Sequence, residues 1–437
     1  MSMDVVIAGA GMGGLSASIA MGLKGQQTTL LERREVFGEV GAGIQLGPNS
    51  TRLLQSWGLS KALETYAAWP SHIEVFRFDQ QNALARLSLG ESFKARYGAP
   101  YATIHRADLQ AILYERMQAI GQTHLCMGAS LRDLKSTEQS VQIQVQTQDK
   151  MQDKMQDKMH DQDSGSSKMR LSFDRESSTP QNLQAKALIG ADGVSSDVRR
   201  LHWPLRHIHA TPHLAYRTTI AQKLLPLKLR QSCVQVHCGP QMHWVHYPIR
   251  CGEWLNIVAL IEAPIDDAHL QDTLQTPLQQ TWLEHIPLEL SRQHFRLALR
   301  GAHSDLQDLF RAVGEWSPWR LFDANPLQGA HQMAKGRVAL LGDAAHPMLP
   351  FLAQGAGMSI EDAALLAQYW SHVEQDETLR LERYAQSRWL RNAQVQKRAR
   401  LNASVFHARG MLSGLRNLGL SLFGERLLDM PWLYGYR

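Results

Sequence analysis

The chain has 437 residues, more than one hydrophobic core usually serves, so we expect two domains that share an interface. Its hydrophobic content of 44% is ordinary for a globular enzyme, and its net charge of +5 favours small anionic partners without requiring nucleic acid. No apolar stretch reaches the length of a membrane span, and the four cysteines lack the spacing of zinc ligands. We therefore expect a cytoplasmic protein with no nucleic-acid, membrane or metal partner.

The N-terminal residues predict a βαβ unit. Apolar runs at residues 4–8 and 28–32 predict two buried strands, which flank a helix over residues 11–23. The turn before this helix has the G-x-G-x-x-G glycines Gly9, Gly11 and Gly14. Such glycines let the backbone approach a dinucleotide pyrophosphate at the helix N-terminus, and Glu32 suits the ribose hydroxyls. This unit predicts dinucleotide binding and leaves NAD and FAD open.

Two amphipathic helices and a pair of strands follow. Apolar stripes predict helices over residues 48–57 and 106–120. Strict alternation predicts a half-buried strand over residues 141–146, with residues 169–173 as its antiparallel partner. Between them lie three tandem Gln-Asp-Lys-Met copies, whose like charges repel one another at helical spacing. We interpret this insertion, about residues 147–168, as an exposed loop without a catalytic role.

A region rich in short strands interrupts the α/β pattern. Strand-like runs with many His, Trp and Tyr residues cover 215–220, 233–237, 243–248 and 254–261. The predicted fold class is therefore α/β, a Rossmann-type domain with an inserted, mostly antiparallel sheet that serves as substrate domain. We assign residues 1–71, 101–200 and 301–437 to the nucleotide-binding domain, the last segment with C-terminal helices, and residues 72–100 and 201–300 to the substrate domain.

A second motif distinguishes between the two dinucleotides. Residues 338–341 predict another strand, and Gly342 and Asp343 follow at its end. A single carboxylate there can hydrogen-bond to a polyol chain, which FAD has and NAD lacks. Gly355 and Gly357 then precede a helix whose positive N-terminus suits the anionic pyrimidine edge of a reduced flavin. These residues favour FAD.

A third motif, Gly190-Ala-Asp192-Gly193, follows a short strand predicted at residues 187–189. Together with the first two motifs, it resembles the fingerprints of the single-component FAD-dependent aromatic hydroxylases, which share the para-hydroxybenzoate hydroxylase fold. The resemblance covers nearly the whole chain outside the repeat insertion. It is strongest to the branch that hydroxylates salicylate, 3-hydroxybenzoate and 6-hydroxynicotinate.

The resemblance implies a cofactor role for each matched residue. The first motif would contribute Gly9, Gly11, Met12 and Gly14. The rest of FAD would meet Glu32 and Arg33 at the adenosine ribose, Leu131 near the adenine, Arg106 at the ribityl and pyrophosphate region, Asp343 at the ribityl chain, Gly355 and Gly357 at the isoalloxazine ring, and Arg217 against the flavin. Asp192 would serve the pyrophosphate and, transiently, NADH or NADPH, for which this family has no separate domain.

The resemblance also implies the reaction and the residues around the substrate. Such enzymes use NAD(P)H and O2 to hydroxylate a small aromatic or N-heteroaromatic ring, often a hydroxylated acid, through a C4a-hydroperoxyflavin. Gln45, Pro347, His213 and Tyr216 would line the substrate cavity. His213 and Tyr216 are the predicted catalytic residues, because a base beside a phenol raises its reactive phenolate fraction. Pro350, where 3-hydroxybenzoate hydroxylases tend to have a polar residue, disfavours that particular substrate.

Three functions remain open at the level of sequence. Beside the hydroxylase stand a flavin oxidase or dehydrogenase that forms no hydroperoxide, and a flavin-binding regulatory protein without catalysis. Only NAD(P)H oxidation stimulated by a ring compound, with a hydroxylated product, separates the first from the others. The assembly we expect is a monomer or a homodimer.

Overall fold

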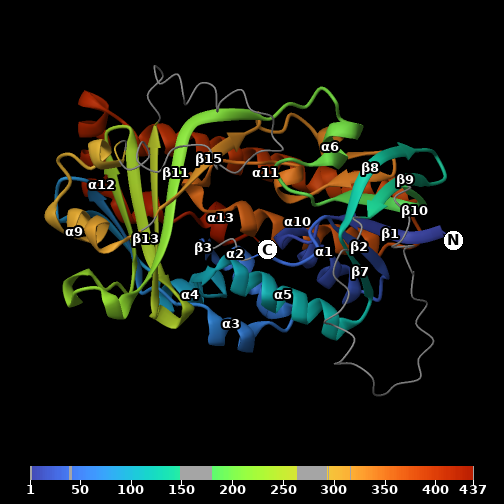
Figure 1. Ribbon diagram of the computed structural model, residues 1–437, viewed down its shortest axis with the longest axis horizontal. Helices are drawn as coiled ribbons and strands as arrows, with labels where there is room; N and C mark the ends of the chain where they lie inside the picture. The colour runs from blue at the N-terminus through green and yellow to red at the C-terminus, as the bar shows by residue number, and fades with distance from the viewer. Residues whose placement is uncertain are drawn as a thin grey trace.

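The computed structural model describes residues 2–38, 42–147, 180–262, 293, 295–314 and 316–436. An eight-stranded sheet lies at the right of the view and a seven-stranded sheet at the left, with helices between and around them (Figure 1). A two-stranded ribbon of β3 (Gly43–Leu46) and β6 (Ala102–His105) completes the sheets of the described chain. The mixed α/β class predicted from the sequence is confirmed.

The eight-stranded sheet contains the predicted βαβ unit. Its strands run in the order β16 (Ala334–Lys335), β17 (Val338–Leu340), β10 (Gln181–Gly190), β1 (Ser2–Ala8), β2 (Thr28–Glu32) and β7 (Thr123–Met127), with β8 (Ala129–Ser136) and β9 (Val141–Thr147) attached through β10. The five strands from β17 to β7 are parallel to one another. Parallel strands are usually covered on both faces, and residues 5–8 of β1 are accordingly all buried. All five carboxyl ends therefore meet at one edge of the sheet.

The strand predicted at residues 141–146 exists as β9, but its predicted partner is wrong. β9 pairs with β8 on one side and with β10 on the other, both antiparallel, so neither of its edges is left for residues 169–173. Those residues and the Gln-Asp-Lys-Met copies at 148–159 lie outside the described residues. The interpretation of the insertion as an exposed loop stays a prediction.

Helices lie between and around the two sheets (Figure 1). They are α1 (Met12–Gly22), α2 (Pro48–Ser56), α3 (Ser60–Tyr66), α4 (Glu91–Tyr97), α5 (Arg106–Ile120), α6 (Asp197–His202), α9 (Ser304–Ala312), α10 (Gly355–Trp370), α11 (Glu377–Phe406), α12 (Gly410–Leu428) and α13 (Pro431–Tyr434). α1 packs against both α10 and α5. The predicted helices at 48–57 and 106–120 are confirmed as α2 and α5, and Gly121 ends α5 with a φ of 70°.

The seven-stranded sheet is mostly antiparallel, as predicted. Its order is β15 (Ser317–Asp323), β11 (His209–Ala221), β14 (Trp254–Glu262), β13 (Met242–Ile249), β12 (Val234–Gly239), β4 (His72–Arg77) and β5 (Ala83–Ser88). β15 comes from the segment assigned above to the nucleotide-binding domain, so this sheet draws on three separate stretches of chain. The division into domains at 71, 100, 200 and 300 stays a prediction.

Alternation along the strands gives the seven-stranded sheet two different faces. Leu214, Tyr216 and Trp244 point to the outer face and form a core with residues of α9. Ala215 and Val258 point to the inner face, where they pack with residues of the loop after β17 and of α11. The inner face is therefore the one that meets the rest of the molecule.

α12 leaves a row of large apolar side chains on the surface. Met411 is 87% exposed, Leu415 64%, Leu418 57% and Leu422 64%. No helix in the described ranges is both long and apolar enough to cross a bilayer. The exposed row is thus a surface feature of α12, and its extent exceeds the single scattered apolar residues that need no explanation.

Candidate functional site

The three motifs meet at the carboxyl edge of the eight-stranded sheet. β17, β10, β1 and β2 are neighbours there, and each is followed by one of the predicted cofactor segments. The N–H of Leu341 donates to the Gly190 carbonyl, and the N–H of Ala191 donates to the Ala8 carbonyl. Ligands of open α/β sheets bind outside the carboxyl ends of the strands. The topology thus places motifs more than 300 residues apart in the sequence around one site.

The glycines of the first motif are required by close backbone contacts. Gly9 has a φ of +97°, and a Cβ there would lie 2.7 Å from the Ala191 carbonyl oxygen. A Cβ on Gly14 would lie 1.8 Å from the Gly9 carbonyl oxygen. A Cβ on Gly11, in contrast, would meet no protein atom within 4 Å. Gly9 and Gly14 therefore serve the turn itself, and Gly11 keeps open the space before the N-terminus of α1.

Glu32 is oriented by the backbone of the turn. One carboxylate oxygen accepts from the N–H of Ala10 at 2.8 Å, and the other accepts from the N–H of Arg34 at 2.9 Å. Arg33, Met12 and Leu131 lie on the same cleft, and Leu131 comes from β8. A carboxylate held at the end of β2 suits the hydroxyls of a ribose, as the sequence predicted.

An open cleft of about 370 Å³ joins these groups. Of the predicted cofactor residues, it is lined by Gly9, Gly11, Met12, Glu32, Arg33, Arg106, Leu131, Asp192 and Asp343. Trp319, Arg320 and Phe322 of β15 form part of its wall, so the seven-stranded sheet contributes to the cleft as well. The sequence prediction missed these three residues, although the alternating run from Ser317 to Asp323 is a recognisable strand signal.

Opposite charges and an uncompensated cation lie at the inner end of this cleft. Burial lowers the pKa of Arg106, against the attraction of Asp343. Burial and the neighbouring Arg106 lower the pKa of Arg217 to about 10. The guanidinium of Arg217 lies 5.1 Å from the ring centroid of Trp319, and its Nε has no hydrogen-bond partner among the described residues. A buried arginine beside a second arginine favours a bound anion or an acceptor such as a flavin ring atom.

Asp192 and Arg199 connect the third motif to the other two. Asp192 accepts from the N–H of Val198 at 3.1 Å, and its carboxylate also hydrogen-bonds with the side chain of Ser196. Burial raises the pKa of Asp192. Arg199 is 3% exposed and donates to the carbonyls of Asp343 and Ala344 at 3.2 and 2.8 Å. Arg199 therefore fixes the turn that presents Asp343, a role that the sequence had not assigned.

A buried ionic network on α10 and α11 holds the Gly342–Asp343 turn in place. Asp362 on α10 accepts from the N–H of Gly342 at 3.0 Å, from His346 Nε2 at 2.5 Å and from Arg388 Nε at 2.7 Å. Burial alone would raise the pKa of Asp362, but His346 and Arg388 hold it well below its usual range. His346, which is fully buried and paired with Asp362, therefore has a structural role in this turn. α10 begins at Gly355, where a Cβ would lie 3.8 Å from Asp343 Oδ1, so the helix N-terminus with Gly355 and Gly357 adjoins the same turn.

His213 lies at the far end of the inner sheet face, in a group of histidines. Its Nε2 is 4.0 Å from Glu262 Oε1, and its ring meets that of Phe351 edge-on at 5.3 Å. Burial and His407 lower the pKa of His213 to about 4, below the value near 7 that suits a general base. The imidazole is thus neutral at neutral pH and able to accept a proton, but only weakly basic in this environment.

The structure does not bring Tyr216 to the same face as His213. The two residues differ by three positions along β11, so their side chains point to opposite faces. Tyr216 is 1% exposed and stacks on Phe295 at 5.0 Å in the outer core. The residues of β11 that share the inner face with His213 are Ala215 and Arg217.

The two remaining substrate candidates lie between the sheets. Gln45 on β3 accepts from the hydroxyl of Tyr101 at 2.8 Å and also hydrogen-bonds with Tyr247 of the inner sheet face. Pro347 is buried, and its carbonyl accepts from Gln396 Nε2 at 3.0 Å. Pro350 is exposed and begins a 3₁₀ turn, while Phe351 after it is buried. None of these residues lines the cofactor cleft itself.

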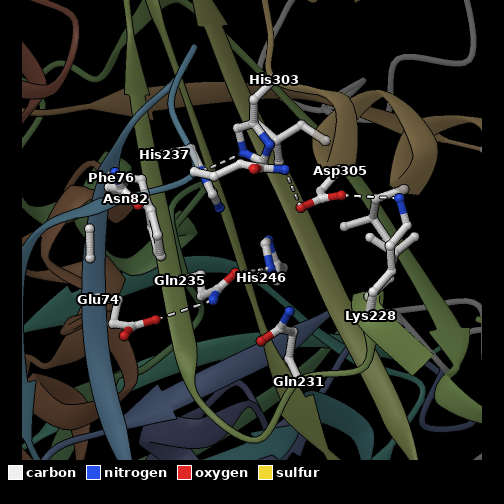
Figure 2. A pocket seen from close by; sticks show the side chains of 15 residues that line it. Glu74, Phe76, Asn82, Lys228, Gln231, Gln235, His237, His246, His303 and Asp305 are labelled. Atoms are coloured by element: carbon white, nitrogen blue, oxygen red, sulfur yellow. Dashed lines mark hydrogen bonds and ion pairs between the residues drawn. The ribbon is translucent and has the colours of Figure 1, made fainter. Parts of the chain in front are cut away.

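A second cavity, of about 560 Å³, lies on the outer face of the seven-stranded sheet (Figure 2). Trp244 donates to His246 Nδ1, so His246 carries its proton on Nε2 and donates to Gln235, which in turn donates to Glu74. Although this cavity is larger, it contains none of the predicted site residues and none of the three motifs. The cleft at the carboxyl ends is therefore the candidate functional site.

The fold and the cleft define a flavoprotein in which a Rossmann-type unit holds a dinucleotide against a second, antiparallel sheet. The FAD binding domain family matches residues 2–211 and 308–399, and the chain belongs to this family. The unpartnered Nε of Arg217, the carboxylate of Asp343 and the glycine turn at Gly9 fit the ring, polyol and pyrophosphate parts of FAD.

Relatives and solved structures extend this assignment. The chain is 30% identical over 436 residues to the 3-hydroxybenzoate 6-hydroxylase of Polaromonas naphthalenivorans (strain CJ2), covering 99% of this chain and 96% of that protein. It is 27% identical over 398 residues to the 6-hydroxynicotinate 3-monooxygenase of Bordetella bronchiseptica, covering 90% of this chain and 89% of that protein. A salicylate hydroxylase with bound substrate has a TM-score of 0.75 at 21% identity, covering 100% of this chain and 95% of that one. Klebsiella pneumoniae HpxO with FAD and uric acid has a TM-score of 0.74 at 20% identity, with 98% and 95% covered. These two structures support the fold.

Proposed function

We propose that this protein is an FAD-dependent monooxygenase that uses NAD(P)H and O2 to hydroxylate a small, hydroxylated aromatic or N-heteroaromatic acid. The observation that carries the proposal is the convergence of three motifs at one sheet edge, where Asp343 could hydrogen-bond to a polyol chain, which FAD has and NAD lacks. Relatives that match nearly the whole chain hydroxylate 3-hydroxybenzoate and 6-hydroxynicotinate. When bound, FAD supplies the activated oxygen.

Several residues of the cleft would then bind the parts of FAD and the nicotinamide cofactor. Glu32 and Arg33 hold the adenosine ribose, and Asp343 binds the ribityl hydroxyls. Arg106 and Arg217 provide positive charge at the inner end of the cleft, where Arg217 would lie against the flavin. Asp192 would serve the pyrophosphate of FAD and, during reduction, the nicotinamide cofactor. No second dinucleotide fingerprint exists in the sequence, so NADH or NADPH would use this same cleft.

The substrate would lie between Gln45 and Pro347, with its hydroxyl towards His213. A neutral imidazole can accept the phenolic proton, and the resulting phenolate is the better nucleophile towards activated oxygen. A pKa of about 4 makes His213 a weak base before the ring binds. The reaction therefore requires that the bound substrate or its anion raises this pKa.

Coupling is the amount of hydroxylated product formed per NAD(P)H consumed. It measures whether His213 accepts the proton of the substrate. The ring substrate is first identified by screening hydroxylated benzoates and nicotinates for stimulated NAD(P)H oxidation with a hydroxylated product. His213→Ala should still bind FAD and oxidise NAD(P)H, but should release most of the reducing equivalents as hydrogen peroxide. A loss of about 10²–10⁴-fold in the hydroxylation step is the scale of general-base catalysis.

Tyr216→Phe is the matched control for this experiment. Because Tyr216 packs in the outer core, removal of its hydroxyl should leave coupling close to that of the wild type. If His213→Ala keeps wild-type coupling, His213 is structural. If Tyr216→Phe lowers coupling instead, the Tyr216 hydroxyl takes part in catalysis. Its position in the outer core would then be wrong.

Location and assembly belong to the proposal as well. Four free cysteines, three of them buried, are in keeping with a reducing compartment such as the cytoplasm. Of the two expected assemblies, the exposed apolar row on α12 favours the homodimer. Light scattering on the purified protein decides between them, and Leu418→Lys should yield monomers if α12 forms the interface.

A further inference from the structure

Three side chains with metal-binding atoms meet at one end of the inner face of the seven-stranded sheet. They are His213 on β11, Glu262 at the end of β14 and His407 directly after α11. One ring nitrogen of each histidine and one carboxylate oxygen of Glu262 all lie within 4.8 Å of one another. His407 Nδ1 is 3.1 Å from Glu262 Oε1, and His213 Nε2 is 4.0 Å from the same oxygen.

The backbone holds all three residues in place. His213 and Glu262 are directly paired across β11 and β14, so their side chains share a face. The N–H of His407 donates to the Ala403 carbonyl at the end of α11, and its own carbonyl accepts from the N–H of Gln241 in the turn between β12 and β13. The cluster is therefore built from three separate elements, each fixed by backbone hydrogen bonds.

Two neighbouring side chains, His243 and Arg409, form hydrogen bonds with the cluster residues. Such hydrogen bonds usually orient the ligands of a metal ion. His407 Nε2 is 3.0 Å from His243 Nδ1, and Arg409 donates to Glu262 Oε2 at 3.0 Å. If His407 directs a lone pair from Nδ1 towards a cation, its proton sits on Nε2 and is donated to His243. Ligating histidines commonly donate their other N–H in this manner, and ligating carboxylates are themselves hydrogen-bonded.

We propose that His213, Glu262 and His407 bind a divalent transition-metal ion, for which zinc is the natural choice. Two imidazoles and a carboxylate are a frequent zinc ligand set, and they leave a fourth position for water. Arg409 donates to the second oxygen of Glu262, and a hydrogen bond from a cation favours the charged form of a carboxylate.

Only a small adjustment is needed for coordination. Zinc–nitrogen and zinc–oxygen bonds of about 2.0–2.2 Å place tetrahedral ligand atoms roughly 3.4 Å apart. The separation of 3.1 Å between His407 and Glu262 already fits, and His213 Nε2 has to approach Glu262 Oε1 by roughly 0.6 Å, from 4.0 Å to about 3.4 Å. Nδ1 of His213 has no hydrogen-bond partner in the described part of the chain, so no such bond holds the ring against this movement.

The proposed metal has a consequence that rests on the function proposed above. A metal on His213 Nε2 occupies the lone pair that would accept the substrate proton. Zinc should therefore suppress hydroxylation reversibly without displacing FAD, whose cleft residues do not include the cluster. The site would act as an inhibitory switch on substrate activation.

A second cluster provides an internal control. His72, Glu74 and Cys233 also bring their ligand atoms within 4.8 Å. Burial raises the pKa of Cys233 to about 11, so the thiol stays protonated, and Arg86 approaches His72 Nδ1 at 3.1 Å. Both features disfavour a cation there. Loss of His72 should leave zinc binding unchanged.

Equilibrium dialysis of the FAD-loaded enzyme against zinc decides the proposal. One zinc per chain is expected for the wild type and for His72→Gln, whereas His407→Gln and Glu262→Gln should bind at least about 10- to 100-fold more weakly. Retained FAD and an unchanged circular dichroism spectrum establish that each variant is folded. Cobalt binding, followed by its d–d absorption, gives a second readout with the same variants. Failure of the wild type to retain zinc, or equal binding by His407→Gln and Glu262→Gln, overturns the proposal.

Coupling in the presence of zinc separates this inference from the proposed function. If zinc binds as expected but hydroxylation is unaffected, the metal site stands and His213 is not the proton acceptor. If no ring is hydroxylated under any condition, the dialysis result still decides whether the site exists. If zinc binds and suppresses hydroxylation in the wild type, His72→Gln should respond in the same way.

Discussion

The cofactor cleft and the seven-stranded sheet behind it hold polar groups in opposite ways. In the cleft, Arg33 and Asp343 are exposed, and the turn between β1 and α1 presents backbone in place of side chains. In the sheet, His243 and His246 are only 3% exposed, and burial lowers the pKa of each well below its ordinary value. The cleft thus has accessible charged groups that can bind an anionic cofactor, whereas the imidazoles of the sheet are neutral and buried.

The glycines at Gly14 and Gly11 offer the sharpest test of how the cleft is built. Gly14→Ala places a methyl group 1.8 Å from the Gly9 carbonyl oxygen, so the turn itself must deform. We expect a loss of about 3 kcal/mol or more in unfolding free energy, measured by urea denaturation. Gly11→Ala meets no protein atom, so it should fold normally and yet bind FAD poorly. Normal stability of Gly14→Ala would contradict the turn geometry.

This contrast explains which parts of the molecule the sequence could predict. The cleft is encoded by short contiguous motifs at strand ends, so residues such as Gly9, Glu32 and Asp343 could be assigned from spacing alone. The inner sheet face is assembled from every second residue of strands far apart in the chain. The family resemblance implies that Tyr216 and His213 both face the substrate, but the alternation of β11 points the two side chains to opposite faces. The pairing of His213 with Glu262 and His407 depends on tertiary structure and has no local signal.

The next largest effect is expected from Asp343→Ala, on the affinity for FAD. Removal of its carboxylate in Asp343→Ala loses charged hydrogen bonds to the ribityl chain, each worth about 1.5–3 kcal/mol. That corresponds to about 10- to 100-fold weaker FAD binding, measured by fluorescence titration of the apoprotein. Asp197→Ala is a suitable control, because Asp197 lines the same cleft but pairs with Arg200. Equal affinities for the two variants would remove Asp343 from the cofactor site.

The buried histidines of the seven-stranded sheet predict that the unfolding free energy of the protein depends on pH. The pKa of His246 falls from 6.5 to about 3 because of burial and the neighbouring His303. A lowered pKa means that the unfolded chain binds the proton more readily, so the stabilising contribution is complete above about pH 6.5 and is lost as the pH falls towards 3.

His246→Gln tests this dependence. Glutamine can still accept from Trp244 and donate to Gln235, so the fold should persist. The unfolding free energy of the wild type should fall more steeply below pH 6.5 than that of the variant, by about 1.4 kcal/mol per pH unit. Urea denaturation at several pH values between 7.5 and 5 measures the difference. Parallel curves would mean that the pKa of His246 is the same in the folded and the unfolded protein.

The smallest effect is expected from the repeat insertion, which belongs to neither region. β9 and β10 are antiparallel neighbours, paired between Val141–Val145 and Gln181–Ala185, and the insertion lies in the chain that connects them. Replacing residues 148–166 with a short Gly-Ser turn shortens that loop, and the entropy of loop closure changes by only about 0.5 kcal/mol. FAD content, turnover and coupling should therefore remain close to those of the wild type, since no residue of the cleft is altered. A variant that folds and carries FAD but has lost its activity would assign a functional role to the Gln-Asp-Lys-Met copies.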